Sequence, residues 1–426
     1  MEWIKTISDF MTGLDPTIML PIVVFCLGMI LGQKPGRALV SAITVGVGFV
    51  GLNLVIGLLL GALDPATKAL IEATGVRLEA VDVGWGVGAA IAFSTTIGAL
   101  IIPLAFGINI LMLLTRTTKT LNVDMWNFWH FAFTGSVVYL ALGGGTRGLG
   151  YGLLGGGLHC VISLLIGDLT AKKVQEFFRL PNISIPQGWC VSSVPIIYAA
   201  NLVLDRIPVL KDINWDERMI REKLGVMGQP VMMGSVLGLA FGLMAYGLDR
   251  RALLLSVQMA AVMLLVPRII AIFMEGLTPL SEAGRQFMQK HFKGRDFYIG
   301  LDSAILIGHP ITIAAAIVLI PITLFLAFVL PGNRVLPFAD LAATAFFVCM
   351  VPPLTKGNLF RTILYGTLIM AAVLMLSSAF APMITDIARE SGVYAIPADA
   401  TMISGLSNGN WIAWAIMELG KKLSGL

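Results

Sequence analysis

Apolar stretches without charged residues follow one another along the whole chain, and short polar connections separate them. A membrane-spanning helix needs roughly 20 mainly apolar residues, and many of the stretches approach this length. We therefore expect an all-α polytopic membrane protein with about ten to twelve membrane segments and no soluble domain. The stretches are Pro16–Gln33, Ala38–Leu63, Val83–Thr115, Met125–Thr146, Gly148–Gly167, Asn182–Leu204, Gly225–Leu248, Ala252–Pro267, Ser303–Asn333, Leu341–Thr355, Thr362–Thr385 and Ala400–Met417.

Two of these stretches, Val83–Thr115 and Ser303–Asn333, are too long for one untilted helix. We expect each to contain a re-entrant element followed by a spanning helix. The 46 glycines and 20 prolines of the chain suit membrane helices that pack closely or are interrupted. The triplets Gly143–Gly145 and Gly155–Gly157 are expected to serve close helix packing.

The two halves of the chain resemble each other. Pro16 matches Pro230 at a shift of 214 positions, and the same shift places Arg37–Leu39 on Arg251–Leu253, both of which read Arg-Ala-Leu. Such residues in one register predict an internal repeat. We therefore divide the chain into a first membrane repeat at 1–204, a connecting segment at 205–224 and a second membrane repeat at 225–426.

The charges predict that this repeat is inverted. The polar segment 64–79 carries two basic and three acidic residues, a net charge of −1, whereas its counterpart 282–296 carries four basic and two acidic residues, a net charge of +2. By the positive-inside rule the first segment faces outward and the second faces the cytoplasm. Inverted repeats whose broken helices meet near the membrane midplane are typical of transporters.

The composition excludes several other classes of protein. Hydrophobic residues make up 57% of the chain and charged residues 13%, with a mean hydropathy of +0.86, whereas a soluble domain carries about 25% charged residues. The net charge of +4 is too small to suggest nucleic-acid binding. No metal-ligand spacing, nucleophile motif or nucleotide-binding loop is present, so we expect neither a metal nor a cofactor. The four cysteines lie in apolar stretches and are expected to be inert.

Ionisable and polar residues inside membrane segments are costly, and each is therefore a candidate for a site. Asp82 and Trp85 lie in a glycine-rich segment, where a carboxylate accepts hydroxyl hydrogen bonds and an indole stacks on a sugar face; alternatively, Asp82 caps a helix. Asn127 and His130 are three residues apart and share one helical face. They contact either a ligand or a neighbouring helix.

Two further candidates lie at predicted breaks in the backbone. Gln187 follows Pro186 and precedes Gly188, and irregular backbone at membrane depth survives only where protein or a water-filled cavity satisfies it. Alternatively, this segment is a loop outside the membrane. Asp302 and His309 flank a short apolar segment and would form the walls of a polyol site, or else a helix cap and a core histidine.

At these residues the chain resembles the galactitol-type IIC subunit of the bacterial phosphoenolpyruvate-dependent phosphotransferase system, within the ascorbate–galactitol superfamily. The resemblance extends from about residue 14 to 385, and it is specific only when its segments are taken together. They are LDPTIMLPIV, GVGFVGLNLVIGLLL, VDVGW, LLTRTTKTLNVDMWNFWHFAFTG, NISIPQG, AAVMLLVPRII, GLTPLSEAGR, IGLDSAILIGH, PGNRVLPFADLA and KGNLFRT.

This resemblance implies a homodimer in the bacterial inner membrane, surrounded by lipid, that moves its substrate by an elevator mechanism. Each protomer would have scaffold helices at about 16–63 and 225–274 and a mobile core at about 80–204 and 297–420. The substrate, galactitol or a related alditol or sugar, would be phosphorylated by a phosphocysteine on a separate IIB subunit, which IIA charges. Relatives tend to have a histidine and a Thr-Ser pair where this chain has Gln187, Trp189 and Cys190, so another polyol or a pentitol stays open as substrate.

The residues that we expect to bind substrate are Asp82, Trp85, Asn127, His130, Gln187, Asp302 and His309. Either Asp302 or His309 would accept the hydroxyl proton during phosphoryl transfer, and the chain is expected to carry no phosphorylation site of its own. One alternative is an ion-coupled secondary transporter of the same fold, in which Asp82 and Asp302 carry the coupling ion. A membrane enzyme is a further alternative, against which the lack of a nucleophile or metal motif speaks.

Overall fold

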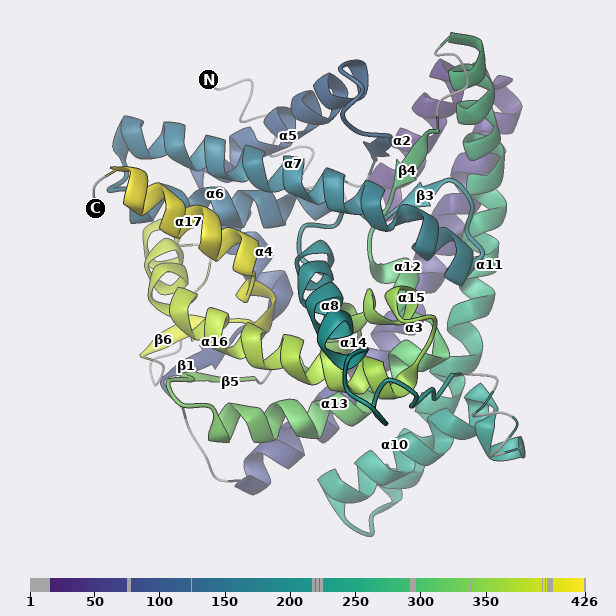
Figure 1. Ribbon diagram of the computed structural model, residues 1–426, viewed down its shortest axis with the longest axis vertical. Coiled ribbons are helices and arrows are strands. Elements are labelled where there is room, and N and C mark those ends of the chain that lie inside the picture. Colours follow the sequence, from purple (N-terminus) through teal and green to yellow (C-terminus); the bar gives the residue numbers. More distant parts are fainter. Residues whose placement is uncertain are drawn as a thin grey trace.

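The fold is seen in a computed structural model (Figure 1). It describes residues 16–74, 78–123, 125–216, 219, 222, 225–291, 296–337, 339–392, 394, 396 and 401–424. Most of these residues are helical, which confirms the main expectation from the sequence. The side chain of Trp126 and the whole of Asp124 lie outside the described part.

Four helices pack chiefly with one another: α2 (Pro16–Ile30), α3 (Pro35–Thr74), α10 (Pro230–Tyr246) and α11 (Arg250–His291). Helix α11 forms the right-hand edge of Figure 1. Glycine allows α3 and α11 to cross closely, because a Cβ atom on Gly276 would lie 2.6 Å from the backbone nitrogen of Val45. Along the outer faces of these helices large apolar side chains such as Leu54 and Leu253 are exposed.

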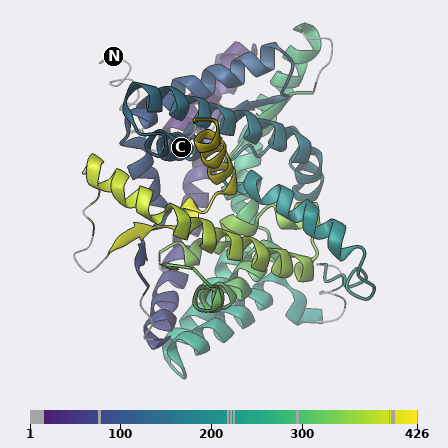
Figure 2. The same cartoon turned by 60° about the vertical axis from the view of Figure 1, so that its left-hand side comes forward.

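The remaining long helices form a second group, in which α7 (Gly145–Phe178) packs on α5 (Thr96–Leu114) and α6 (Trp129–Ala141), and α13 (Pro310–Val329) packs on α16 (Leu359–Ser391). Figure 2 shows α16 crossing the middle of the molecule. A Cβ atom on Gly156 of α7 would lie 2.7 Å from the carbonyl oxygen of Phe131 in α6. The packing role expected of Gly155–Gly157 is thereby confirmed, whereas Gly143–Gly145, all with positive φ, instead make the turn between α6 and α7.

Both of the overlong apolar stretches are broken, as predicted. Helix α4 (Gly84–Phe93) ends two residues before α5, and Thr95 begins α5 by accepting a hydrogen bond from the Gly98 N–H. In the second half, α12 (Ala304–Ile307) is followed by α13, whose first residue is Pro310. Each break leaves a short helical element ahead of a helix long enough to span a membrane.

The helical expectation missed six short strands. Strand β1 (Ala80–Asp82) lies between β5 (Val335–Leu336) and β6 (Met402–Ser404), and β4 (Tyr298–Gly300) lies between β2 (Thr120–Asn122) and β3 (Ile183–Ser184); every pairing is parallel. The two sheets lie at opposite sides of Figure 1. Strands of two or three residues are too short to produce an alternating pattern in the sequence, so nothing in it predicted them.

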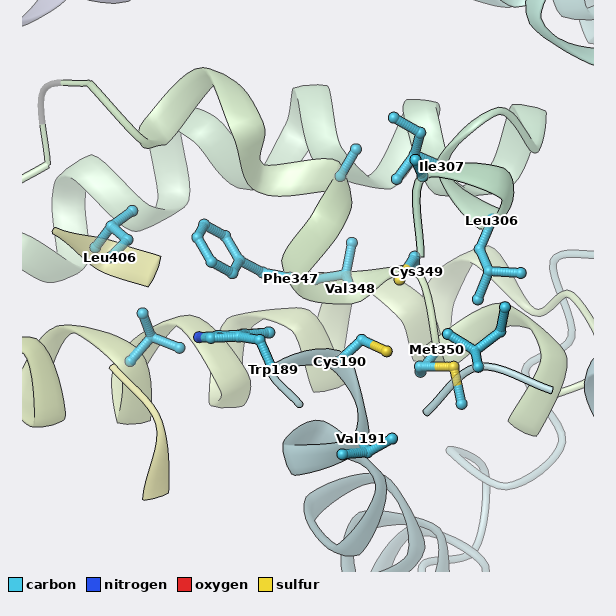
Figure 3. Packing of buried hydrophobic residues seen from close by; sticks show 14 of the residues in the cluster. Trp189, Cys190, Val191, Leu306, Ile307, Phe347, Val348, Cys349, Met350 and Leu406 are labelled. Atoms are coloured by element: carbon cyan, nitrogen blue, oxygen red, sulfur yellow. The ribbon is translucent and has the colours of Figure 1, made fainter. Parts of the chain in front are cut away.

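Five helices among the described residues are long and apolar enough to cross a membrane: Pro35–Leu70, Thr96–Leu114, Gly145–Phe178, Pro310–Val329 and Leu359–Glu390. Five shorter helices are also apolar. The total of ten to twelve membrane segments stays a prediction. A core of buried apolar side chains extends through both groups of helices, and in it Trp189 faces Phe347 at 4.5 Å between ring centroids (Figure 3).

Candidate functional site

The segment between β3 and α8 (Cys190–Leu204) contains Gln187, a predicted site residue that contacts another one, His130. It is fully buried, and its backbone is irregular, as Pro186 and Gly188 predict. A Cβ atom on Gly188 would lie 2.8 Å from the Cβ atom of His130, so only glycine permits this approach. Gln187, next to it, reaches His130 with 2.7 Å between Nε2 of the amide and Nε2 of the ring.

The hydrogen bonds determine how these two side chains are oriented. Oε1 of Gln187 accepts a hydrogen bond of 2.6 Å from the Cys190 N–H, so the amide NH₂ group points toward His130. Nε2 of His130 is therefore an acceptor, and the proton of the neutral ring is on Nδ1. The imidazole also lies against the Trp129 indole, with 3.8 Å between ring centroids. The result is a buried, uncharged pair that offers both donors and acceptors.

The backbone of this segment is held from two sides. The carbonyl oxygen of Gly188 accepts hydrogen bonds from Nε2 of His159 at 2.9 Å and from Nδ2 of Asn410 at 3.0 Å. Nδ1 of His159 lies 2.6 Å from Oγ1 of Thr134. His159 therefore ties α7 to α6 and to the Gln187 segment.

Asn127 and Asp302 are the predicted site residues whose side chains make few hydrogen bonds within the described part of the chain. Asn127 is buried, and its Nδ2 atom has no hydrogen-bond partner within the described part of the chain. Asp302 is half-buried, and its Oδ1 atom accepts a hydrogen bond of 2.6 Å from the Ala304 N–H. Its carboxylate also lies within electrostatic range of Cys190, which follows the Gln187 segment.

Asp82 holds two parts of the backbone together. Its side chain is 2% exposed and accepts hydrogen bonds from the backbone N–H groups of Gly84, Ala339 and Asp340 at 3.0, 3.1 and 2.9 Å. The capping alternative describes these contacts well, because all three donors are main-chain groups. The Trp85 side chain is 40% exposed, and its backbone N–H donates to Oδ1 of Asp340.

His309 is placed as a helix cap. Its Nδ1 atom accepts a hydrogen bond of 3.2 Å from the Ile311 N–H at the start of α13. Its ring packs against Phe177 and Phe178, at 4.5 and 5.7 Å between centroids. These contacts give His309 a structural role as a half-buried helix cap, and not as the core histidine of the structural alternative.

Polar residues that the sequence analysis did not select lie near this site. Asp340, Ser407 and Asn408 are buried, and Oδ2 of Asp340 accepts a hydrogen bond of 2.9 Å from the Ser407 N–H. The signal for Asp340 was a carboxylate within an apolar region. For the other two it was the sequence Gly-Leu-Ser-Asn-Gly-Asn, a polar, glycine-rich break at the start of the last apolar stretch.

A comparison with protein families assigns this architecture. The family described as "PTS system sugar-specific permease component" matches residues 9–399. The chain belongs to this permease family. It is therefore a multi-pass membrane component IIC of a phosphotransferase system, which acts on a sugar-type substrate together with IIA and IIB components.

Individual relatives agree with this assignment. A protein of Escherichia coli K12, named as a candidate permease IIC component, is 44% identical over 411 residues, which cover 96% of this chain and 93% of the relative. The galactitol-specific EIIC components of the phosphotransferase systems of E. coli K12 and E. coli O157:H7 are each 39% identical over 414 residues, which cover 97% of this chain and 90% of the relative. The resemblance stated from the sequence is confirmed.

Proposed function

We propose that this permease carries a neutral alditol, galactitol or a close relative of it, and that the substrate binds at His130 and Gln187. The observation that carries the proposal is the buried, uncharged amide–imidazole pair beside the unpartnered Nδ2 atom of Asn127. An alditol has hydroxyl groups and no charge, so it is recognised by paired donors and acceptors. The 39% identity to galactitol-specific components supports the same substrate class.

We further propose that the two halves are inverted repeats. The elements α2, α3, β1 and α4 recur in the same order as α10, α11, β4 and α12. The sheets support the same relation, because β1 pairs with two strands of the second half and β4 with two strands of the first half. The group of α2, α3, α10 and α11 would be the scaffold of a homodimer, and the other elements would be the core that moves across it.

The coupling follows from the family. Once the core exposes its substrate to the cytoplasm, phosphorylated IIB would transfer its phosphoryl group to an alditol hydroxyl. The charged phosphate ester would then be trapped on the cytoplasmic side of the bacterial inner membrane. Of the two residues that we considered as acceptor of the hydroxyl proton, Asp302 is the better supported. It lies near the Gln187 segment, whereas the Nδ1 atom of His309 caps α13.

The proposal is tested by uptake of labelled galactitol and a panel of pentitols into inside-out and right-side-out membrane vesicles, with and without phosphorylated IIB. We expect accumulation of the phosphate ester only when phosphorylated IIB is present on the cytoplasmic side. Accumulation of unmodified solute that follows a proton gradient would contradict the proposal and favour the ion-coupled alternative.

The site itself is tested by Gln187→Leu, which removes the amide that faces His130. We expect the affinity for galactitol to fall roughly 10- to 100-fold, because substrate hydroxyls then face an unpaired imidazole. The matched control is Gln229→Leu, at an exposed position ahead of α10, which should bind as the wild type does. Equal affinities for the wild type and Gln187→Leu would exclude Gln187 from the site.

A further inference from the structure

The segment between β6 and α17 (Trp411–Ser424) contains the densest group of unpartnered polar atoms in the described part of the chain. Asn408 is 1% exposed and Ser407 4% exposed. Both amide atoms of Asn408, Nδ2 and Oδ1, lack a hydrogen-bond partner among the described residues, whereas the Ser407 hydroxyl lies beside the Asp340 carboxylate. Buried polar groups in native proteins are nearly always hydrogen-bonded, so an amide with both of its polar atoms unpartnered indicates a missing partner.

These atoms converge on one place. A Cβ atom on Gly405 would lie 3.1 Å from Oδ1 of Asn408, 3.2 Å from Oδ2 of Asp340 and 3.3 Å from Oγ of Ser407. From the α4 side, a Cβ atom on Gly88 would lie 3.3 Å from Nδ2 of Asn408. Glycine on both sides leaves the polar atoms facing bare backbone. Together they offer the amide N–H donors, a hydroxyl group and two further acceptor oxygens.

The group adjoins the Gln187 segment. Asn410, two residues after Asn408, donates to the carbonyl oxygen of Gly188, and the Trp411 indole N–H donates to the carbonyl oxygen of Ser192. In the apolar layer of Figure 3, Leu406 lies near Trp189 and Phe347. The two segments also hold matching places in the fold. One follows β3 and precedes α8, and the other follows β6 and precedes α17.

We propose that Ser407 and Asn408, beside Asp340, form a second hydroxyl-binding subsite of the permease, which takes the part of the alditol that His130 and Gln187 do not contact. This inference rests on the proposed function. A secondary hydroxyl group both donates and accepts a hydrogen bond, so it fits an amide whose N–H and C=O are both unpartnered. Both residues lie beyond position 399, where the match to the family model ends.

The subsite is tested by binding of galactitol and its 1-, 2- and 3-deoxy analogues to the purified full-length protein, by calorimetry. The variants are Asn408→Leu, which keeps the side-chain size without polar atoms, and Ser407→Ala. We expect Asn408→Leu to raise the Kd of galactitol at least tenfold and Ser407→Ala to raise it less. For the analogue that lacks the contacted hydroxyl, the wild type and Asn408→Leu should bind equally, because the contact is absent in both.

Three outcomes would overturn the subsite. The first is an unchanged galactitol Kd for Asn408→Leu, which would mean that water satisfies the amide. The second is an equal loss of affinity for every analogue, which would mean that the substitution acts through the fold. If Asn408→Leu does not fold, the galactitol Kd of Ser407→Ala is compared with that of the wild type instead. An unchanged Kd for Ser407→Ala is then the third outcome that would overturn the subsite. Gln187→Leu separates the hypotheses: if it loses binding while Asn408→Leu and Ser407→Ala keep it, the proposed function stands and the subsite fails.

Discussion

The two small sheets have the same construction but use polar side chains differently. In each, a central strand from one half of the chain lies between two strands from the other half. Around β4, the hydroxyl groups of Thr120 and Ser184 lie 2.7 Å apart, and Asp168 of α7 accepts from Thr118 and Thr120. Around β1, a buried carboxylate, Asp82, instead accepts three main-chain N–H groups.

The difference shows which polar atoms are used by the fold and which remain for a ligand. Asp168 and Asp82 are both carboxylates among apolar helices, yet the hydrogen bonds of each go to the protein itself. The buried side-chain atoms without a hydrogen-bond partner in the described part of the chain all belong to neutral residues, among them Asn127 and Asn408. If the proposed site is correct, the charge of a buried residue is a poor guide to where this permease binds its substrate.

The largest expected effect is on stability, from Asp82→Ala. This substitution leaves three backbone N–H groups without their buried acceptor, and we expect a loss of roughly 3 kcal/mol or more in the free energy of unfolding. The thermal midpoint of the purified protein, followed by size-exclusion chromatography after heating, measures the change.

The control for this prediction is Asp302→Ala, at the corresponding break in the second half. Asp302 is half-buried and accepts a hydrogen bond from the Ala304 N–H, so we expect a loss of only about 1 kcal/mol. If Asp302→Ala destabilises the protein as much as Asp82→Ala does, the number of backbone hydrogen bonds to each carboxylate does not determine its contribution to stability.

A medium effect is expected where glycines allow helices to pack. Gly156→Ala would bring its Cβ atom to 2.7 Å from the carbonyl oxygen of Phe131, and the backbone cannot move locally to relieve this contact. We expect it to cost about 1–3 kcal/mol. Gly366→Ala in α16 meets instead the end of the Leu319 side chain, which can change rotamer, and it should cost less. If Gly366→Ala lowers the thermal midpoint more than Gly156→Ala does, contact with the backbone is not the costlier of the two kinds of contact.

The smallest effect is expected from the ion pairs at the ends of the two sheets. Lys119 and Asp296 lie 2.7 Å apart beside β2 and β4, and Arg334 and Glu79 lie 3.6 Å apart beside β5 and β1. The hydrogen bond to Lys119 lowers the pKa of Asp296, so its contribution is present above the ordinary aspartate pKa and is lost as the pH falls through the lowered value. Because both side chains are about half exposed, the pair contributes less than about 1 kcal/mol.

Unfolding of the wild type and Asp296→Asn between about pH 3 and 7 measures this contribution. The two proteins should differ slightly at pH 7 and converge at low pH. The matched control is Glu79→Gln, at the longer ion pair, which should differ still less from the wild type. A difference for Asp296→Asn that persists unchanged to pH 3 would exclude the ion pair as its cause.

Much of the fold was predictable because membrane helices carry a strong signal. The breaks before Thr96 and Pro310 and the glycine packing of α7 followed from apolar runs, prolines and glycines. The strands did not, because parallel pairing between Ala80 and Val335 depends on contacts between distant parts of the chain. Short strands buried among helices also lack the alternation that a half-exposed strand has.

The candidate site was predictable only in part. The geometry brings His130 and Gln187 into contact, and Asp302 lies within electrostatic range of Cys190, but substrate binding by these residues stays a prediction. Asp82 and His309 were selected because ionisable residues are costly in membranes, and that criterion cannot distinguish a ligand contact from a backbone cap. Asn408 was not selected, because its unpartnered amide is visible only after folding.

The exchange of strands between the halves also determines when the core can be completed during synthesis. Both strands that pair with β1 come from the second half, so β1 stays unpaired during synthesis until residues 335–336 and 402–404 have been made. The first half therefore enters the membrane as an incomplete structure. At that stage the Asp82 carboxylate cannot yet accept hydrogen bonds from the N–H groups at 339–340. A chain stopped before residue 402 would keep most of its membrane helices and still present an open strand edge to the quality-control machinery of the cell.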